Sequence, residues 1–140
     1  MNVVKGHKDL TVWKEAVELA AACYKMTEGF PSVEQRGLAS QMRRAAVSIA
    51  SNIAEGAART SNKEFVQFLY ISLGSASELD TQIEIARTIG LSSGPETEAL
   101  QAKVNGISRM LQGLIQSVKT RSAQPGSPIT SHRSPRTDGQ

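Results

Sequence analysis

The sequence predicts an all-α protein, an antiparallel up-down-up-down four-helix bundle with a disordered C-terminal tail. Aromatic residues make up only 4% of the 140 residues, and strand-forming residues are sparse, whereas helix formers such as Ala, Leu, Glu and Gln are plentiful. Four segments repeat apolar residues at intervals of three and four, the period of a helix with one buried face. The connections between these segments are short, so consecutive helices should run antiparallel.

The first helix is expected within residues 9–30, DLTVWKEAVELAAACYKMTEGF, and Gly29 with the turn after it ends the helix. The second helix is expected to begin after Ser32 and to end near Gly56. Ser32 and Gln35 have the spacing of a capping box, in which two side chains satisfy backbone N–H groups at a helix start. The residues expected to face the core are Trp13, Ala16, Val17, Ala20, Tyr24 and Thr27 in the first helix and Leu38, Met42, Ala45, Ala46, Ile49 and Ile53 in the second.

The third helix is expected to follow Ser61, which forms a second capping box with Glu64, and to continue up to Gly90. The fourth is expected to begin near Ser93, where Pro95 suits a first helical turn. Its apolar residues alternate in spacings of four and three, which is typical of a heptad stripe. They are Leu100, Val104, Ile107, Leu111, Leu114 and Val118.

Composition divides the chain into a bundle of residues 1–121 and a Pro/Ser-rich tail of residues 122–140. The tail holds three of the five prolines and almost no apolar residues, which predicts disorder. His132, Arg133 and Arg136 make it slightly basic, so an auxiliary nucleic-acid contact is the alternative to a solvated tail. No long apolar run, signal-peptide pattern or cysteine pair is present, which predicts a cytoplasmic protein without membrane contact.

Residues that usually build catalytic or metal sites are scarce. His7 and His132 lie outside the predicted helices, and no Cys/His cluster or glycine-rich phosphate loop is present. Cys23 lies in an apolar stretch and is interpreted as a small buried hydrophobe. We therefore predict a protein that is not an enzyme and holds no metal and no cofactor. A nucleophilic Ser48 or Ser51 is one enzymatic alternative. The other is a carboxylate cluster of Glu55, Glu78, Asp80 and Glu84, for which salt bridges are the simpler interpretation.

The second predicted helix contains a stretch of unusually small residues, RRAAVSIASNIAEG at residues 43–56. The side opposite its core face carries Val, Ser and Ala in its middle, where a solvent face normally carries Lys, Glu and Gln. Small residues allow close helix approach, which predicts that another subunit covers this side; a simple surface filler is the alternative. The residues expected in interface or structural polar contacts are Arg43, Arg44, Ser48, Ser51, Asn52, Glu55 and Glu78.

Two stretches carry a resemblance to a known family, DLTVWKEAVELA and GLASQMRRAAVSIASNIAEGAARTSNKEFVQFLYISLGSASELDTQIEIA. They resemble the four-helix-bundle proteins encoded in intervening sequences of bacterial 23S ribosomal RNA genes, over residues 9 to about 90. The resemblance implies a homo-oligomeric ring, with pentamers the known form among relatives. It extends to accessory proteins of diversity-generating retroelements, which bind nucleic acid and associate with a reverse transcriptase through a basic surface.

The resemblance and the net charge of +3 together predict a homo-oligomer that binds structured RNA or other nucleic acid through a basic surface. A ring would repeat a modest basic patch and so raise avidity. Aromatic residues are few, so stacking on single-stranded bases is not favoured. The alternative is a protein-interaction module whose partner is a reverse transcriptase or another protein. The residues expected to contact nucleic acid are Arg36, Arg59, Lys63, Arg87, Lys103, Arg109, Lys119 and Arg121.

Overall fold

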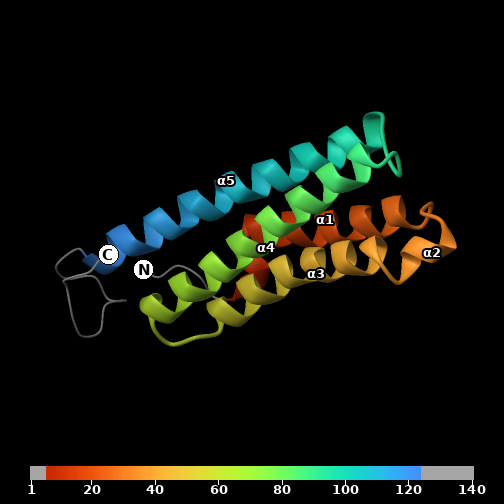
Figure 1. Cartoon of the computed structure of the whole chain (residues 1–140). Helices are drawn as coiled ribbons and strands as arrows, with labels where there is room; N and C mark the ends of the chain where they lie inside the picture. Colours follow the sequence, from red (N-terminus) through yellow and green to blue (C-terminus); the bar gives the residue numbers. More distant parts are fainter. Residues whose placement is uncertain (1–5, 124–140) are drawn as a thin grey trace.

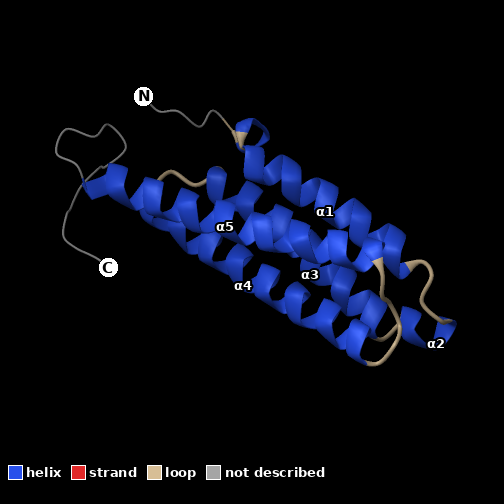
Figure 2. Cartoon of the chain, turned by 90° about the horizontal axis from the view of Figure 1, so that it is seen from above, coloured by secondary structure: helices blue, strands red, loops and turns tan. Residues whose placement is uncertain are grey.

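The computed structural model describes residues 6–123, which contain helices and no strand. Four long helices form the bundle (Figure 1). They are α1 (Thr11–Thr27), α3 (Leu38–Ala57), α4 (Asn62–Thr88) and α5 (Pro95–Ala123), and two short helices, η1 (His7–Asp9) and α2 (Ser32–Gln35), precede α1 and α3. Helices α1 and α3, α3 and α4, α4 and α5, and α1 and α5 pack against each other, which closes the bundle (Figure 2). The all-α four-helix fold predicted from sequence is confirmed; the tail beyond Ala123 lies outside the described residues.

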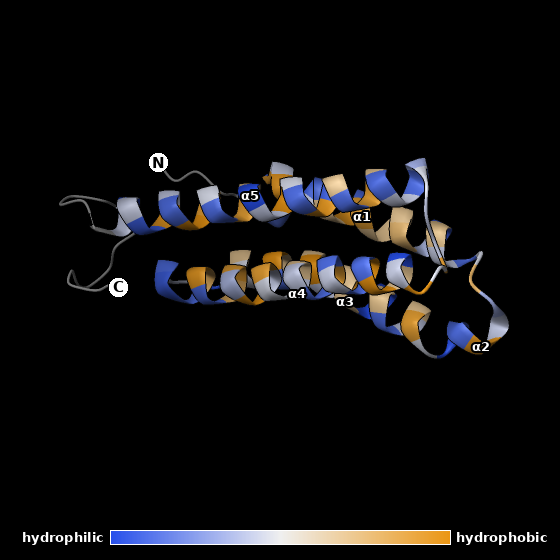
Figure 3. Cartoon of the chain, turned by 45° about the horizontal axis from the view of Figure 1, so that its top comes forward, coloured by the Kyte–Doolittle hydropathy of each residue, from blue (hydrophilic) through white to orange (hydrophobic). Residues whose placement is uncertain are grey.

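The core contains apolar side chains from all four long helices. Hydrophobic and hydrophilic residues alternate around each helix (Figure 3), as expected for helices that bury one face. Each fully buried Leu, Ile or Met side chain contributes about 1.5–3 kcal/mol by leaving water. The largest of them are Leu19, Met42, Ile49, Ile53, Leu69, Leu79, Ile83, Ile107 and Leu111.

The buried face of α1 agrees with the predicted one only in part, since Ala16 and Thr27 are fully buried as predicted. Val17 and Tyr24 are 43% and 47% exposed, whereas Leu19 and Cys23 are fully buried. Helix α1 is rich in alanine and carries apolar residues on more than one side, so periodicity alone offered two faces. Packing against both α3 and α5 selects the face that contains Leu19 and Cys23. In α5, likewise, Leu114 is only partly buried and Ile115 is buried, because α5 contacts two helices and needs a stripe wider than a heptad seam.

The predicted second helix is divided into α2 and α3. The chain leaves helical geometry at Gly37, the N-cap of α3, and the Ser32 side chain caps nothing. The capping box predicted for Ser32 and Gln35 is therefore wrong. The Gln35 amide instead donates hydrogen bonds to the backbone oxygens of Thr27 and Phe30, both at 2.9 Å, and fastens the turn between α1 and α2.

Helix α4 begins and ends as predicted. The Ser61 hydroxyl accepts a hydrogen bond from the Glu64 N–H at 3.1 Å, and Gly90 adopts the left-handed φ of 81° that commonly ends helices. Helix α3 ends at Ala57, one residue after Gly56, as predicted. A Cβ on Gly56 would lie 2.6 Å from Cβ of Phe68, so glycine is needed here for the close approach of α3 and α4.

Candidate functional site

Half of the predicted nucleic-acid contacts lie at one end of the bundle. This end is formed by the end of α3, the loop of residues 58–61, the start of α4 and the end of α5 (Figure 1). The Asn62 amide of α4 donates a 2.8 Å hydrogen bond to the Ser122 hydroxyl of α5, which holds the two helix ends together. We call this the cationic end, and its cationic residues are Arg59, Lys63, Lys119 and Arg121.

The four cations have different surroundings. Arg59 pairs with Glu55 at 3.0 Å and lies over the Phe68 ring, 4.8 Å from its centroid. Lys63 is exposed and makes no hydrogen bond or ion pair with any other described residue. Lys119 donates to the Tyr70 hydroxyl at 3.3 Å. At least Lys63 and Lys119 are therefore not neutralised by a carboxylate within the described chain.

Helix α5 has an uneven charge distribution. Its acidic residues, Glu96 and Glu98, lie in the first turn, and from residue 99 to residue 123 it carries only basic charges. Negative charge at a helix N-terminus is stabilised by the helix dipole, and so is positive charge at the C-terminus. Because of this distribution, the C-terminal part of α5 adds positive potential at the cationic end.

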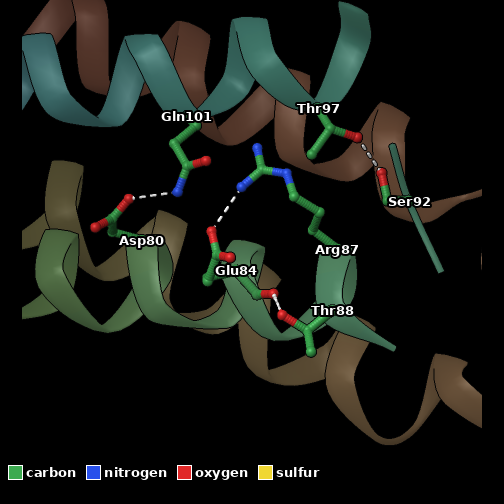
Figure 4. Close-up of polar contacts among 7 residues, drawn as sticks. All are labelled: Asp80, Glu84, Arg87, Thr88, Ser92, Thr97 and Gln101. Carbon is green, nitrogen blue, oxygen red and sulfur yellow. Dashed lines mark hydrogen bonds and ion pairs between the residues drawn. The ribbon is translucent and has the colours of Figure 1, made fainter. Parts of the chain in front are cut away.

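The other predicted contacts lie elsewhere, and two of them are paired. Arg87 binds Glu84 at 2.6 Å in a polar group between α4 and α5, where Gln101 also donates to Asp80 at 2.8 Å (Figure 4). Lys103 lies between two carboxylates of α1, 3.1 Å and 3.4 Å away, and its hydrogen bond to the nearer one raises its pKa. Arg36 is exposed beyond α2, and Arg109 is exposed in the middle of α5. The structure does not bring these four residues together with the cationic end.

Five of the predicted interface residues make side-chain contacts within the chain, and three of these, Arg43, Ser48 and Asn52, are partly buried. Ser48 forms a 3.0 Å hydrogen bond with Ser75 of α4, and the Asn52 amide donates to the Ser48 hydroxyl and backbone oxygen at 2.9 Å each. Arg43 donates to the Thr27 hydroxyl at 2.8 Å and lies over the exposed Tyr24 ring of α1. Through Arg43 and Ser48, these contacts hold α3 against α1 and α4 within the bundle.

The remaining members are exposed on the outer side of α3 and α4. Ser51 is exposed, and Arg44 and Glu78 line one hollow of about 540 Å³ between the two helices, together with Gln41, Ala45 and Ser48. Arg44 makes no hydrogen bond or ion pair with another residue of the described range. Glu55 is also exposed and pairs with Arg59.

Large apolar side chains surround these polar residues. Val47 of α3 is 42% exposed, and Ile71 of α4 is 50% exposed. Val17 and Tyr24 lie on the neighbouring α1. We call this surface of α1, α3 and α4 the outer α3 face. Apolar side chains that gather on one side of a small domain are typical of a surface that is covered by another molecule.

The described residues assemble no catalytic group. The Ser48 hydroxyl contacts Ser75 and Asn52, whereas His7 packs its ring against Trp13. Burial raises the pKa of the Cys23 thiol to about 11, so it stays protonated at neutral pH and is a poor nucleophile.

Residues 6–123 also offer no metal site and no membrane-spanning helix. No group of three or more His, Cys, Asp or Glu residues there is arranged to hold a metal ion. The four carboxylates of the enzymatic alternative have separate partners, namely Arg59, Gln82, Gln101 and Arg87. None of the helices in that range has the length and apolar character that a membrane span requires.

Comparison with known proteins identifies a protein family and a similar solved structure. A family model described as 23S rRNA-intervening sequence protein matches residues 8–113. The fold is similar to a crystal structure from Bacteroides thetaiotaomicron VPI-5482, described as a protein with unknown function from the S23 ribosomal protein family. The TM-score is 0.68 at 23% sequence identity, and the alignment covers 76% of this chain and 99% of the other. No curated protein matches the chain.

Proposed function

Because the chain belongs to the family of 23S rRNA-intervening sequence proteins, we propose that it is a non-enzymatic homo-oligomer that binds structured RNA or other nucleic acid. The observation that carries the proposal is the cationic end. There the acid-free part of α5 meets Arg59 of the α3–α4 connection and Lys63 of the first turn of α4. Nucleic acid is the polyanion that such a surface attracts most strongly, since binding releases the counterions of its phosphates.

The charge at this end is modest for one chain. Four cations lie there against two carboxylates, those of Glu55 and Glu64, which leaves a net charge of 4 − 2 = +2. A single patch with this net charge binds nucleic acid only weakly. Several copies in one assembly would engage one RNA together, and the effective concentration of the second and later contacts would raise the affinity.

The outer α3 face is the surface that we assign to this assembly. It combines the half-exposed apolar side chains of Val47 and Ile71 with the small side chain of Ser51. Two copies of this face could therefore approach closely, and none of these three side chains would bring a charge into the interface. Arg44 and Glu78 have opposite charges in one hollow and no ion pair with each other. Each is therefore available to pair with the opposite residue of a neighbouring copy.

The proposal is tested by titrating the full-length protein with the intervening RNA at about 50 mM salt and at higher salt. We expect log Kd to rise linearly with log salt. The double variant Lys63→Gln/Lys119→Gln should reduce that slope by about 2, because each lysine neutralises about one phosphate. The matched control is Lys14→Gln/Lys25→Gln, which removes the same charge from exposed positions on α1, outside the cationic end. No binding at low salt, or an equal loss in the control, would contradict the proposal.

A further inference from the structure

We propose that the surface along the α4–α5 boundary at the cationic end, named the α4–α5 groove, binds unpaired nucleotides, with the Tyr70 ring as the platform on which a base stacks. The proposal rests on the proposed nucleic-acid binding and specifies the form of nucleic acid: single strands, loops or bulges rather than duplex. Tyr70 was not among the predicted site residues, because the few aromatic residues of the sequence did not favour stacking on single-stranded bases.

The first argument is the position of the Tyr70 ring. It is 49% exposed in the N-terminal third of α4, although a tyrosine of a bundle helix can bury most of its ring. The Lys119 ammonium lies 5.7 Å from the ring centroid and 3.3 Å from the hydroxyl oxygen. A cation beside an exposed aromatic ring can bind a phosphate while the ring stacks on the attached base.

The second argument is the composition of the groove. Three contacts trace the α4–α5 boundary, namely Asn62 with Ser122, Tyr70 with Lys119, and Asp80 with Gln101. Lys63, Tyr70 and Ser77 follow each other at intervals of seven residues, so they lie on one side of α4. All three are exposed, and on α5 the same spacing relates the exposed Gln112 to Lys119. The groove near Tyr70 is thus lined by cations and neutral hydrogen-bonding groups.

The third argument is the position of the carboxylates. Glu64 lies four residues before Phe68, which packs against Gly56 of α3, so Glu64 belongs to the α3 side of α4. Asp80, the first carboxylate along the groove, is ten residues from Tyr70, or about 15 Å along the helix. It also accepts the hydrogen bond of Gln101. A phosphate near Tyr70 would therefore meet Lys63 and Lys119 without a nearby acid.

A duplex does not suit this geometry. Its bases are stacked on each other and offer no free face to a side chain, whereas an unpaired base can stack on an aromatic ring. Duplex binding at the cationic end would use the lysines alone. Stacking on Tyr70 would thus favour unpaired over paired RNA by about 10-fold, the typical effect of one base–aromatic contact.

The test compares a single-stranded RNA of about 12 nucleotides with a duplex of the same length, at low salt and with the full chain. Tyr70→Leu should weaken binding of the single strand by about 10-fold and change duplex binding less than about 2-fold. Tyr70→Phe, which keeps the ring, should bind the single strand within about 2-fold of the wild type. Lys63→Gln should weaken both ligands.

The outcomes separate the two proposals. If the wild type binds neither RNA, the proposed function fails. If it binds but Tyr70→Leu changes neither ligand, or both equally, only the stacking inference is overturned. A second measurement does not depend on how a variant folds: a photoreactive thiouridine in the single strand should cross-link to the wild-type peptide that contains Tyr70. Cross-links confined to other peptides would overturn the inference.

Discussion

Replacing Gly56 with alanine tests the closest contact between α3 and α4. The new Cβ would lie 2.6 Å from Cβ of Phe68, 3.1 Å from a ring carbon of Phe65 and 3.3 Å from the Phe65 backbone oxygen. Two carbon atoms pack best at about 3.5–4.0 Å, so α4 would have to move by about 1 Å. Such overpacking costs about 1–3 kcal/mol, and the better helix propensity of alanine returns about 1 kcal/mol. We expect Gly56→Ala to lower the free energy of unfolding by about 1 kcal/mol.

Gly113→Ala is the matched control. Gly113 is exposed on α5, and a Cβ there would meet nothing within 4 Å, so this variant should gain about 0.5–1 kcal/mol. Both free energies are measured by urea unfolding with circular dichroism, at one protein concentration because assembly adds to apparent stability. The reasoning is refuted if Gly56→Ala is as stable as the wild type or more stable, since the two helices would then not approach as closely as described.

Three further predictions concern assembly and stability. Ser51→Lys should reduce the mass in solution to that of one chain, because it places a charge on the outer α3 face, whereas Ser117→Lys on α5 should leave the mass unchanged. The free energy of unfolding of the wild type, relative to Cys23→Ala, should fall by about 2–3 kcal/mol between about pH 9 and about pH 11. The sign follows because the folded thiol stays protonated in that range while the unfolded thiol ionises. If the difference in unfolding free energy between the two proteins did not change with pH, the burial of Cys23 would be contradicted. Lys103→Met should cost only about 0.5 kcal/mol in urea unfolding, because its ion pairs are partly exposed; a cost several times larger would show a buried pair.

Periodicity and capping patterns were sufficient for the overall fold. The helix stripes of α3 and α4, the Ser61–Glu64 cap and the end of α4 at Gly90 depend on local sequence, and the structure confirms them. The correct face of α1 could not be predicted, because its alanine-rich sequence offered two faces and tertiary packing decided between them. The break at Gly37 was missed for a related reason: Gln35 bonds to the preceding turn rather than to its own helix start.

The candidate site was predictable in composition but not in arrangement. Charge alone could not distinguish Lys63, which no described residue neutralises, from Lys103, whose two partners come from a helix 85 or more residues away in sequence. Tyr70 was missed because its exposure depends on how α4 rotates against α5. Only one signal pointed toward the groove in advance, the absence of acidic residues after the first turn of α5.

The most direct test of the account is the mass of the full-length protein in solution, measured with and without the intervening RNA. One chain has a mass of 15.0 kDa. The account predicts a defined multiple of that mass without RNA, fivefold for a pentamer, and a complex of protein and RNA when the RNA is added at low salt. A 15.0 kDa species that RNA does not change would contradict both the assembly and the nucleic-acid binding.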